Sequence, residues 1–154
     1  MKPPEEVARR LAADWLAKAA KDLMVCEQLL IKGTVFSEAV AFHAQQAAEK
    51  SLKALLVVRQ VEFPKTHDIE RLLELVSLAD GPLAEALADA AELTPFGVEY
   101  RYPGEYAPVT AAAGGCSAVI ARGTARCCPS ALMRCAVTGP RGAPQGKASV
   151  PVAA

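Results

Sequence analysis

The chain has 154 residues and carries 17 basic and 17 acidic residues, so its formal net charge at pH 7 is zero. This length fits a single domain with a core of ordinary size. The sequence contains no run of about 18 apolar residues and no basic segment followed by an apolar one at its start, which argues against a membrane span or a secretory signal. We therefore expect a cytoplasmic protein with no membrane partner.

The charge and the cysteines are unevenly distributed along the chain. Residues 1–110 contain 12 basic and 17 acidic residues, for a net charge of −5, whereas residues 111–154 contain 5 basic and no acidic residues. An acidic body disfavours broad nucleic-acid binding, because affinity for phosphate backbones grows with the number of cationic contacts, and we predict no DNA partner. Four of the five cysteines follow residue 110, but their spacing lacks the paired Cys-x-x-Cys pattern of a zinc ribbon. We predict neither a metal site nor another cofactor.

The apolar periodicity of the first 110 residues predicts four helices and no strand. The expected helices span residues 5–31, 37–59, a shorter stretch that starts at Thr66, and Pro82 to about Glu92. Ser37 and Thr66 are assigned as N-caps because their hydroxyl groups can accept hydrogen bonds from free backbone N–H groups. Thr94 to Gly97 is expected to end the fourth helix. Short connections between such helices favour an all-α, up-and-down bundle of about four to five helices.

The last 44 residues depart from this pattern. A further helix is expected to start just before Gly114 and Gly115 and to be interrupted there, because each glycine in a helix costs about 1 kcal/mol relative to alanine. The sequence beyond Arg122 has no acids and no stable periodicity. We therefore divide the chain into a helical bundle, residues 1–110, and a low-complexity tail, residues 111–154, with the last helix degraded. Two origins of the tail stay open, namely loss of the reading frame between about Thr110 and Gly115 and a natural disordered basic extension.

The second predicted helix carries a line of polar residues. His43, Gln46, Lys50 and Lys53 recur at steps of three and four and so share one face of the helix, beside a face of alanines and leucines. The two lysines lie one helical step apart, which is unfavourable unless an anion or an acidic partner is present. They predict a phosphate-facing basic pair or, alternatively, a solvated helix face. Glu49 does not share the line but is placed to pair with Lys53 at the i+4 position.

Three further residues are candidates for the same site. His67 precedes Asp68, whose carboxylate could orient the imidazole toward the two lysines; the alternative is local helix capping in which His67 takes no part. Arg101 supplies a guanidinium suited to bidentate contact with phosphate, and Tyr102 supplies a phenol, in a turn fixed by Pro103. The alternative for this turn is that it pins the end of the bundle. The predicted nucleotide-binding or partner-binding set is therefore His43, Gln46, Lys50, Lys53, His67, Arg101 and Tyr102.

The order of three motifs resembles the HEPN family of prokaryotic helical domains, in particular the branch that accompanies minimal nucleotidyltransferases. The motifs are His43-Ala-Gln-Gln-Ala-Ala-Glu-Lys50, Thr66-His67-Asp68-Ile69 and Arg101-Tyr102-Pro103. The resemblance covers residues 14–108, approximately. It implies a compact helical bundle, usually dimeric, in a family whose members range from metal-independent ribonucleases to noncatalytic partners of nucleotidyltransferases.

The ribonucleases of this family carry an arginine followed, after four to six residues, by a histidine. No histidine follows Arg101 here, and Arg59 precedes His67 by seven intervening residues. We therefore assign no catalytic residue and favour a noncatalytic, homodimeric partner of a minimal nucleotidyltransferase, in a toxin–antitoxin-like or nucleotide-binding role. The alternatives are a ribonuclease toxin with an atypical site, such as His67 with Arg101, and a structural dimerisation module.

Overall fold

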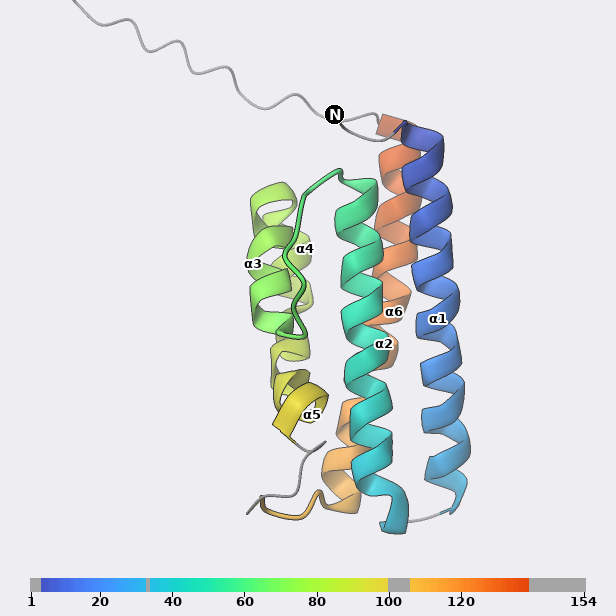
Figure 1. Cartoon of the computed structure of the whole chain (residues 1–154), viewed down its shortest axis with the longest axis vertical. Coiled ribbons are helices and arrows are strands. Elements are labelled where there is room, and N and C mark those ends of the chain that lie inside the picture. The colour runs from blue at the N-terminus through green and yellow to red at the C-terminus, as the bar shows by residue number, and fades with distance from the viewer. Residues whose placement is uncertain (1–3, 33, 100–105, 139–154) are drawn as a thin grey trace, which may run out of the picture.

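The computed structural model describes residues 4–32, 34–99 and 106–138, and every regular element within these ranges is helical (Figure 1). In chain order the elements are α1 (Glu5–Lys32), the 3-10 helix η1 (Thr34–Phe36), α2 (Ser37–Val58), α3 (Ile69–Ala79), α4 (Gly81–Ala86), the 3-10 helix η2 (Ala88–Leu93), α5 (Thr94–Val98) and α6 (Ala111–Thr138). The prediction of an all-α bundle is confirmed. Within the described ranges, no helix combines the length and the apolar character that crossing a membrane requires.

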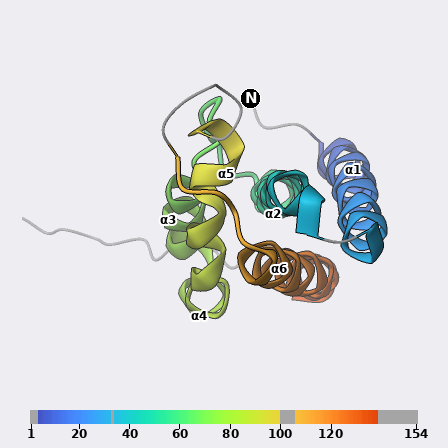
Figure 2. The same cartoon turned by 90° about the horizontal axis from the view of Figure 1, so that it is seen from below.

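Helix α2 is the centre of the bundle, with α1, α6 and the α3–α5 region arranged around it (Figure 2). Its large side chains Leu52, Leu55 and Leu56 are almost completely buried and form the middle of the core. Ala44 and Ala48 have no exposed surface, and their small side chains allow the neighbouring helices to approach closely. A helix covered on so many sides can keep a polar side chain only where that side chain finds a partner.

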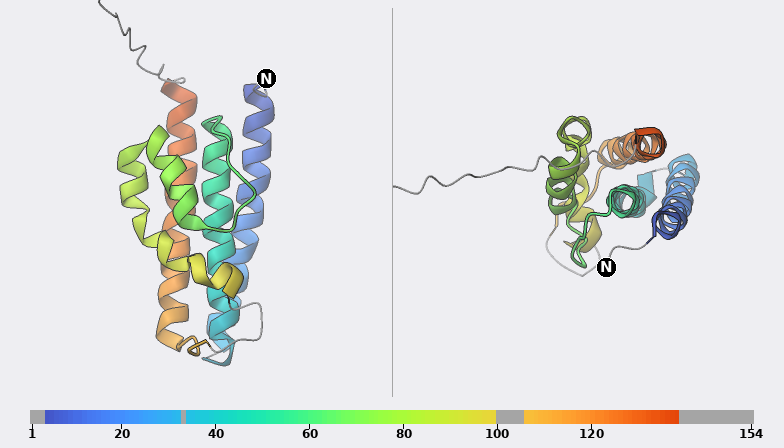
Figure 3. Two further views of the ribbon diagram at one scale, coloured as in Figure 1. Left: turned by 60° about the vertical axis from the view of Figure 1, so that its left-hand side comes forward. Right: turned by 90° about the horizontal axis from the view of Figure 1, so that it is seen from above.

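The three long helices run side by side (Figure 3). Helix α2 runs antiparallel to α1, and α6 runs in the same direction as α2 (Figure 1). The chain returns between α2 and α6 through α3, α4, η2 and α5, which cover one side of the bundle (Figure 3). Before α3, the connection 59–68 runs along α2 in an extended path (Figure 1). This connection brings the predicted site residue His67 back to α2.

The first two helices lie where the sequence predicts them, but both predicted N-caps are wrong. Ser37 is the first residue of α2, and the cap position is Phe36, whose side chain makes no capping hydrogen bond. The cap of α3 is Asp68, whose Oδ1 accepts the backbone N–H of Arg71 at 3.2 Å. The hydroxyl oxygen of Thr66 instead accepts the N–H of Asp68 at 3.0 Å. It therefore orders the residue that makes the cap.

The fourth predicted helix is divided in two. Helix α4 ends at Ala86, and Leu87 leaves the helical conformation before the chain continues as η2. Leu87 and Ala90 are nevertheless buried, as the periodicity predicts. Residues 94–97 were expected to end the helix but instead belong to the short helix α5. The Oγ1 atom of Thr94 accepts the backbone N–H of Ile69 at 3.2 Å, which ties α5 to the start of α3.

Helix α6 continues through the two glycines at which the sequence predicts an interruption. Thr110 begins it, since its Oγ1 atom accepts the backbone N–H of Ala113 at 3.1 Å. A Cβ atom on Gly114 would lie 3.2 Å from the carbonyl oxygen of Ser37, so the glycine lets α6 pack directly against the start of α2. Packing on α2 therefore offsets the helix-breaking cost of the glycines. The part of the predicted tail in 139–154 lies outside the described residues.

Candidate functional site

The predicted polar line on α2 is held by two carboxylates that the sequence analysis did not include in the site. Asp22 on α1 binds the side chains of His43 and Lys50. Glu49 on α2 binds the side chains of Lys53 and His67. We refer to these groups as the Asp22 network and the Glu49 network. Lys50 and Lys53 are therefore each matched by an acid, so they do not form an uncompensated phosphate-binding pair.

The Asp22 network joins α1 to α2. One carboxylate oxygen of Asp22 lies 3.0 Å from Nδ1 of His43, and the other accepts a hydrogen bond from Nζ of Lys50 at 2.5 Å. The side chain of Asp22 is 13 % exposed, whereas those of His43 and Lys50 are 30 % and 19 % exposed. The acid therefore lies beneath the imidazole and the ammonium group, which reach the surface. Such an arrangement fixes both side chains while leaving part of each available to a ligand.

The Glu49 network is more deeply buried. The Glu49 side chain, 4 % exposed, accepts hydrogen bonds from Nζ of Lys53 at 2.7 Å and from Nε2 of Gln45 at 2.9 Å. It also lies 3.1 Å from Nδ1 of His67. Burial by itself would raise the pKa of Glu49, but the hydrogen bonds from Lys53 and Gln45, with the charge of Lys53, lower the pKa below its usual value. Glu49 is therefore a buried carboxylate that stays ionised.

The connection 59–68 is fastened to α2 through the same network. Nζ of Lys53 donates to the carbonyl oxygen of Thr66 at 2.8 Å, and Nε2 of Gln45 donates to the carbonyl oxygen of His67 at 3.1 Å. Gln45 is itself fixed from the other side, because a Cβ atom on Gly97 would lie 2.7 Å from its amide group. Helix α5, the connection and α2 therefore meet around one glutamine side chain.

The structure corrects the expected role of Asp68. Its carboxylate caps α3 and does not orient His67, whose Nδ1 is held by Glu49 instead. The predicted i+4 pair of Glu49 and Lys53 is confirmed. Gln46 joins the same network indirectly, by donating from Nε2 to Oε1 of Gln45 at 2.8 Å. Arg101 and Tyr102, the last two predicted site residues, lie outside the described residues.

Trp15 on α1 completes the site and was also missed. The Nζ atoms of Lys53 and Lys18 lie 5.7 Å and 5.9 Å from the centre of the Trp15 ring, within the range of cation–π attraction. The sequence contained a pattern that could have identified this face of α1. Trp15, Lys18 and Asp22 recur at steps of three and four and therefore share one side of α1, as the polar line does on α2.

The buried cysteine Cys26 does not belong to the site. The thiol of Cys26 is completely buried and donates to the carbonyl oxygen of Val40 at 3.4 Å. Burial, reinforced by the nearby charge of Asp22, raises the pKa of Cys26 to about 11. The thiol is therefore protonated at neutral pH and is unsuited to nucleophilic catalysis.

Comparison with known protein families gives a match between residues 12–128 and the model of the HEPN domain. No curated protein and no solved structure matches the chain. The matched range includes both carboxylate networks and extends past residue 110, where the sequence analysis placed the end of the helical bundle. It ends within α6.

Proposed function

The chain belongs to the HEPN domain family, and we propose that within this family it is a noncatalytic helical partner of a minimal nucleotidyltransferase. The observation that supports this role is the Asp22 network. It holds His43 and Lys50 as a rigid, partly exposed polar surface that spans α1 and α2. A surface with fixed side chains loses little conformational entropy on binding and is therefore suited to recognising a partner or a nucleotide.

The absence of the family's ribonuclease motif also supports a noncatalytic role. The sequence contains two histidines, His43 and His67, and neither follows an arginine at the spacing of that motif. Among the described residues, the guanidinium of Arg59 is bound to Asp80 at 2.8 Å, at the far end of α2 from His43. No described arginine is hydrogen-bonded to either imidazole.

The test is copurification with a nucleotidyltransferase encoded beside this gene. Replacing Lys50 by Ala, or His67 by Ala, should weaken the complex or its binding of a nucleoside triphosphate by about tenfold or more while helicity stays unchanged, since tenfold corresponds to the loss of about one charge-assisted contact. Lys65→Ala is the matched control, because Lys65 is an exposed lysine on the same connection as His67. If both site variants bind as well as the parent, the polar surface is not the recognition surface, and a structural dimerisation role gains support.

One observation favours the ribonuclease alternative. The His67 side chain is 53 % exposed and its Nδ1 is held by Glu49, so Nε2 is the nitrogen available to a substrate. A carboxylate that orients a histidine in this way is a common device of general-base catalysis. Purified protein should therefore be incubated with structured and single-stranded RNA in the presence of a chelator. We expect no cleavage; cleavage that His67→Ala abolishes would favour the ribonuclease.

A further inference from the structure

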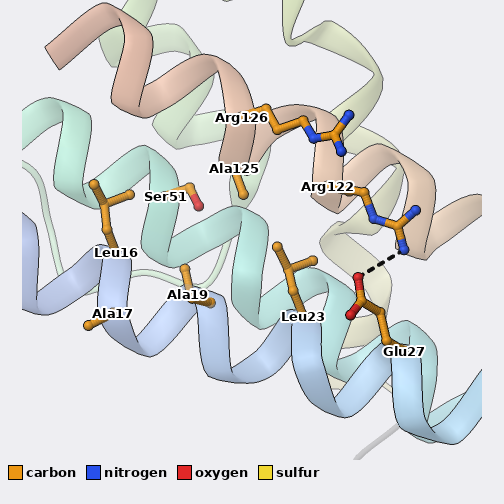
Figure 4. A pocket seen from close by; sticks show the side chains of 10 residues that line it. Leu16, Ala17, Ala19, Leu23, Glu27, Ser51, Arg122, Ala125 and Arg126 are labelled. Carbon is orange, nitrogen blue, oxygen red and sulfur yellow. Dashed lines mark hydrogen bonds and ion pairs between the residues drawn. The ribbon is translucent and has the colours of Figure 1, made fainter. Parts of the chain in front are cut away.

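A groove lies between α1 and α6, with α2 as its floor (Figure 4). It forms because α1 and α6 each pack mainly on α2 and contact one another much less. Ser51, at its floor, belongs to a different side of α2 from the polar line of Lys50 and Lys53. The groove is therefore separate from the two carboxylate networks. Its volume is about 740 Å³, within the range of roughly 300–1,000 Å³ that is typical of small-molecule sites.

Six of the ten residues that line the groove are apolar. The lining residues without a charge are Leu16, Ala17, Ala19, Ala20, Leu23, Ser51 and Ala125. The one hydroxyl group among them, that of Ser51, donates to the carbonyl oxygen of Ala47 at 2.8 Å. The leucines and the small alanine side chains supply a hydrocarbon surface. Such a surface fits the body of a ligand that is itself hydrocarbon.

The charged lining residues are mainly basic, and both basic residues lie on the α6 wall. Arg122 and Arg126 are separated by one helical step on α6 and both line the groove (Figure 4). Of the described lining residues, Glu27 is the one acid, and it binds Arg122 at 3.3 Å. Both side chains of this ion pair are more than a third exposed, at 39 % and 53 %, so the bridge is weak and exchangeable. Two guanidinium groups one helical step apart can both donate hydrogen bonds to one anionic group.

From these features we propose that the groove between α1 and α6 binds an amphipathic anion. The ligand class is a chain or ring of hydrocarbon that ends in a carboxylate or a phosphate. The hydrocarbon lies along Leu16, Leu23 and the alanines, and the anionic group takes hydrogen bonds from Arg122 and Arg126. Guanidinium groups suit this role because their N–H groups match the geometry of carboxylate and phosphate oxygens.

The experiment measures binding of dodecanoate to the full chain by titration calorimetry, below the concentration at which dodecanoate forms micelles, with dodecyl phosphate as a second anion. Saturable binding of at least one anion is expected, and the stronger of the two identifies the head group. The double variant R122Q/R126Q should bind at least about tenfold more weakly, since it loses two charged donors. Lys21→Gln is the matched control, because Lys21 is an exposed cation of α1 that does not line the groove.

A second variant tests the hydrocarbon part independently of charge. Ala20 lines the groove but is exposed, so Ala20→Phe should fill the groove and abolish binding without disturbing the core. Three results would overturn the proposal: no saturable binding of either anion, unchanged affinity in R122Q/R126Q, or equal binding of dodecyltrimethylammonium, which carries the opposite charge. None of these measurements involves a nucleotidyltransferase, so the outcome is independent of the proposed function.

Discussion

The substitution Glu49→Gln is expected to destabilise the fold strongly, because Glu49 is the acceptor on which the second network depends. Its side chain is 4 % exposed and that of Lys53 is 9 % exposed. Removing one partner of a buried ion pair costs about 3–5 kcal/mol, since the other charge is left without compensation. Here the ammonium of Lys53 keeps its hydrogen bond to the carbonyl oxygen of Thr66 and its position over Trp15. We therefore expect the free energy of unfolding to fall by about 3 kcal/mol, the lower end of this range.

The pH dependence of this loss follows from the pKa of Glu49. The pKa in the folded state is lowered from 4.5, so the unfolded chain takes up a proton first as the pH falls. The carboxylate therefore contributes stability that is fully present above pH 4.5 and is lost as the pH falls through the lower folded value. The difference in unfolding free energy between the parent and Glu49→Gln should accordingly narrow as the pH falls below 4.5.

The assay is urea unfolding followed by circular dichroism, with Glu85→Gln as the control. Glu85 is an exposed residue of α4, and its substitution should change the unfolding free energy by no more than about 0.5 kcal/mol. The double variant with Lys53→Met completes a cycle, and its loss should be smaller than the sum of the single losses by roughly 1–3 kcal/mol. Additive losses, or a Glu49→Gln protein as stable as the Glu85→Gln protein, would refute the view that Glu49 and Lys53 act as one buried pair.

Two further predictions concern packing and reactivity. Gly97→Ala should cost about 1–3 kcal/mol in urea unfolding, because the new Cβ atom would lie 2.7 Å from the amide of Gln45, which is fixed by its hydrogen bonds. Gly81→Ala, where nothing lies within 4 Å, should be neutral or stabilising; equal losses at both sites would contradict this packing. In the folded protein at about pH 8, iodoacetamide should modify the exposed Cys116 and spare Cys26, whose pKa is about 11. Mass spectrometry distinguishes the two, and rapid labelling of Cys26 would mean that the bundle opens readily.

The sequence by itself determined the features that depend on neighbours along the chain. Helix α1 and helix α2 lie within a residue or two of their predicted ranges, because a period of 3.6 residues in apolar side chains is a local property. The same reasoning placed the i+4 pair of Glu49 and Lys53 correctly. It also gathered His43, Gln46 and Lys50 on one face of α2, because helical geometry alone fixes which side chains share a face.

Only the tertiary structure decided how those residues are partnered. Asp22 lies 21 residues before His43 in the sequence, and it reaches His43 and Lys50 because α1 and α2 pack with particular faces in contact. His67 is bound by Glu49 and not by its neighbour Asp68, whose carboxylate is used by the start of α3. Such choices depend on how helices rotate and pack against one another, and local periodicity carries no information about this.

The continuation of α6 through Gly114 and Gly115 is also decided by packing between segments that are distant in the sequence. Local propensity counts Gly114 and Gly115 as unfavourable in a helix, and the sequence therefore predicted an interruption there. In the folded protein, Gly114 lies against the backbone of Ser37, where a larger residue would meet the carbonyl oxygen at 3.2 Å. A residue that weakens an isolated helix thus allows α6 to pack closely on α2. Whether Gly114 stabilises or destabilises α6 depends on a contact between segments more than 70 residues apart in the sequence, and only the tertiary structure supplies this contact.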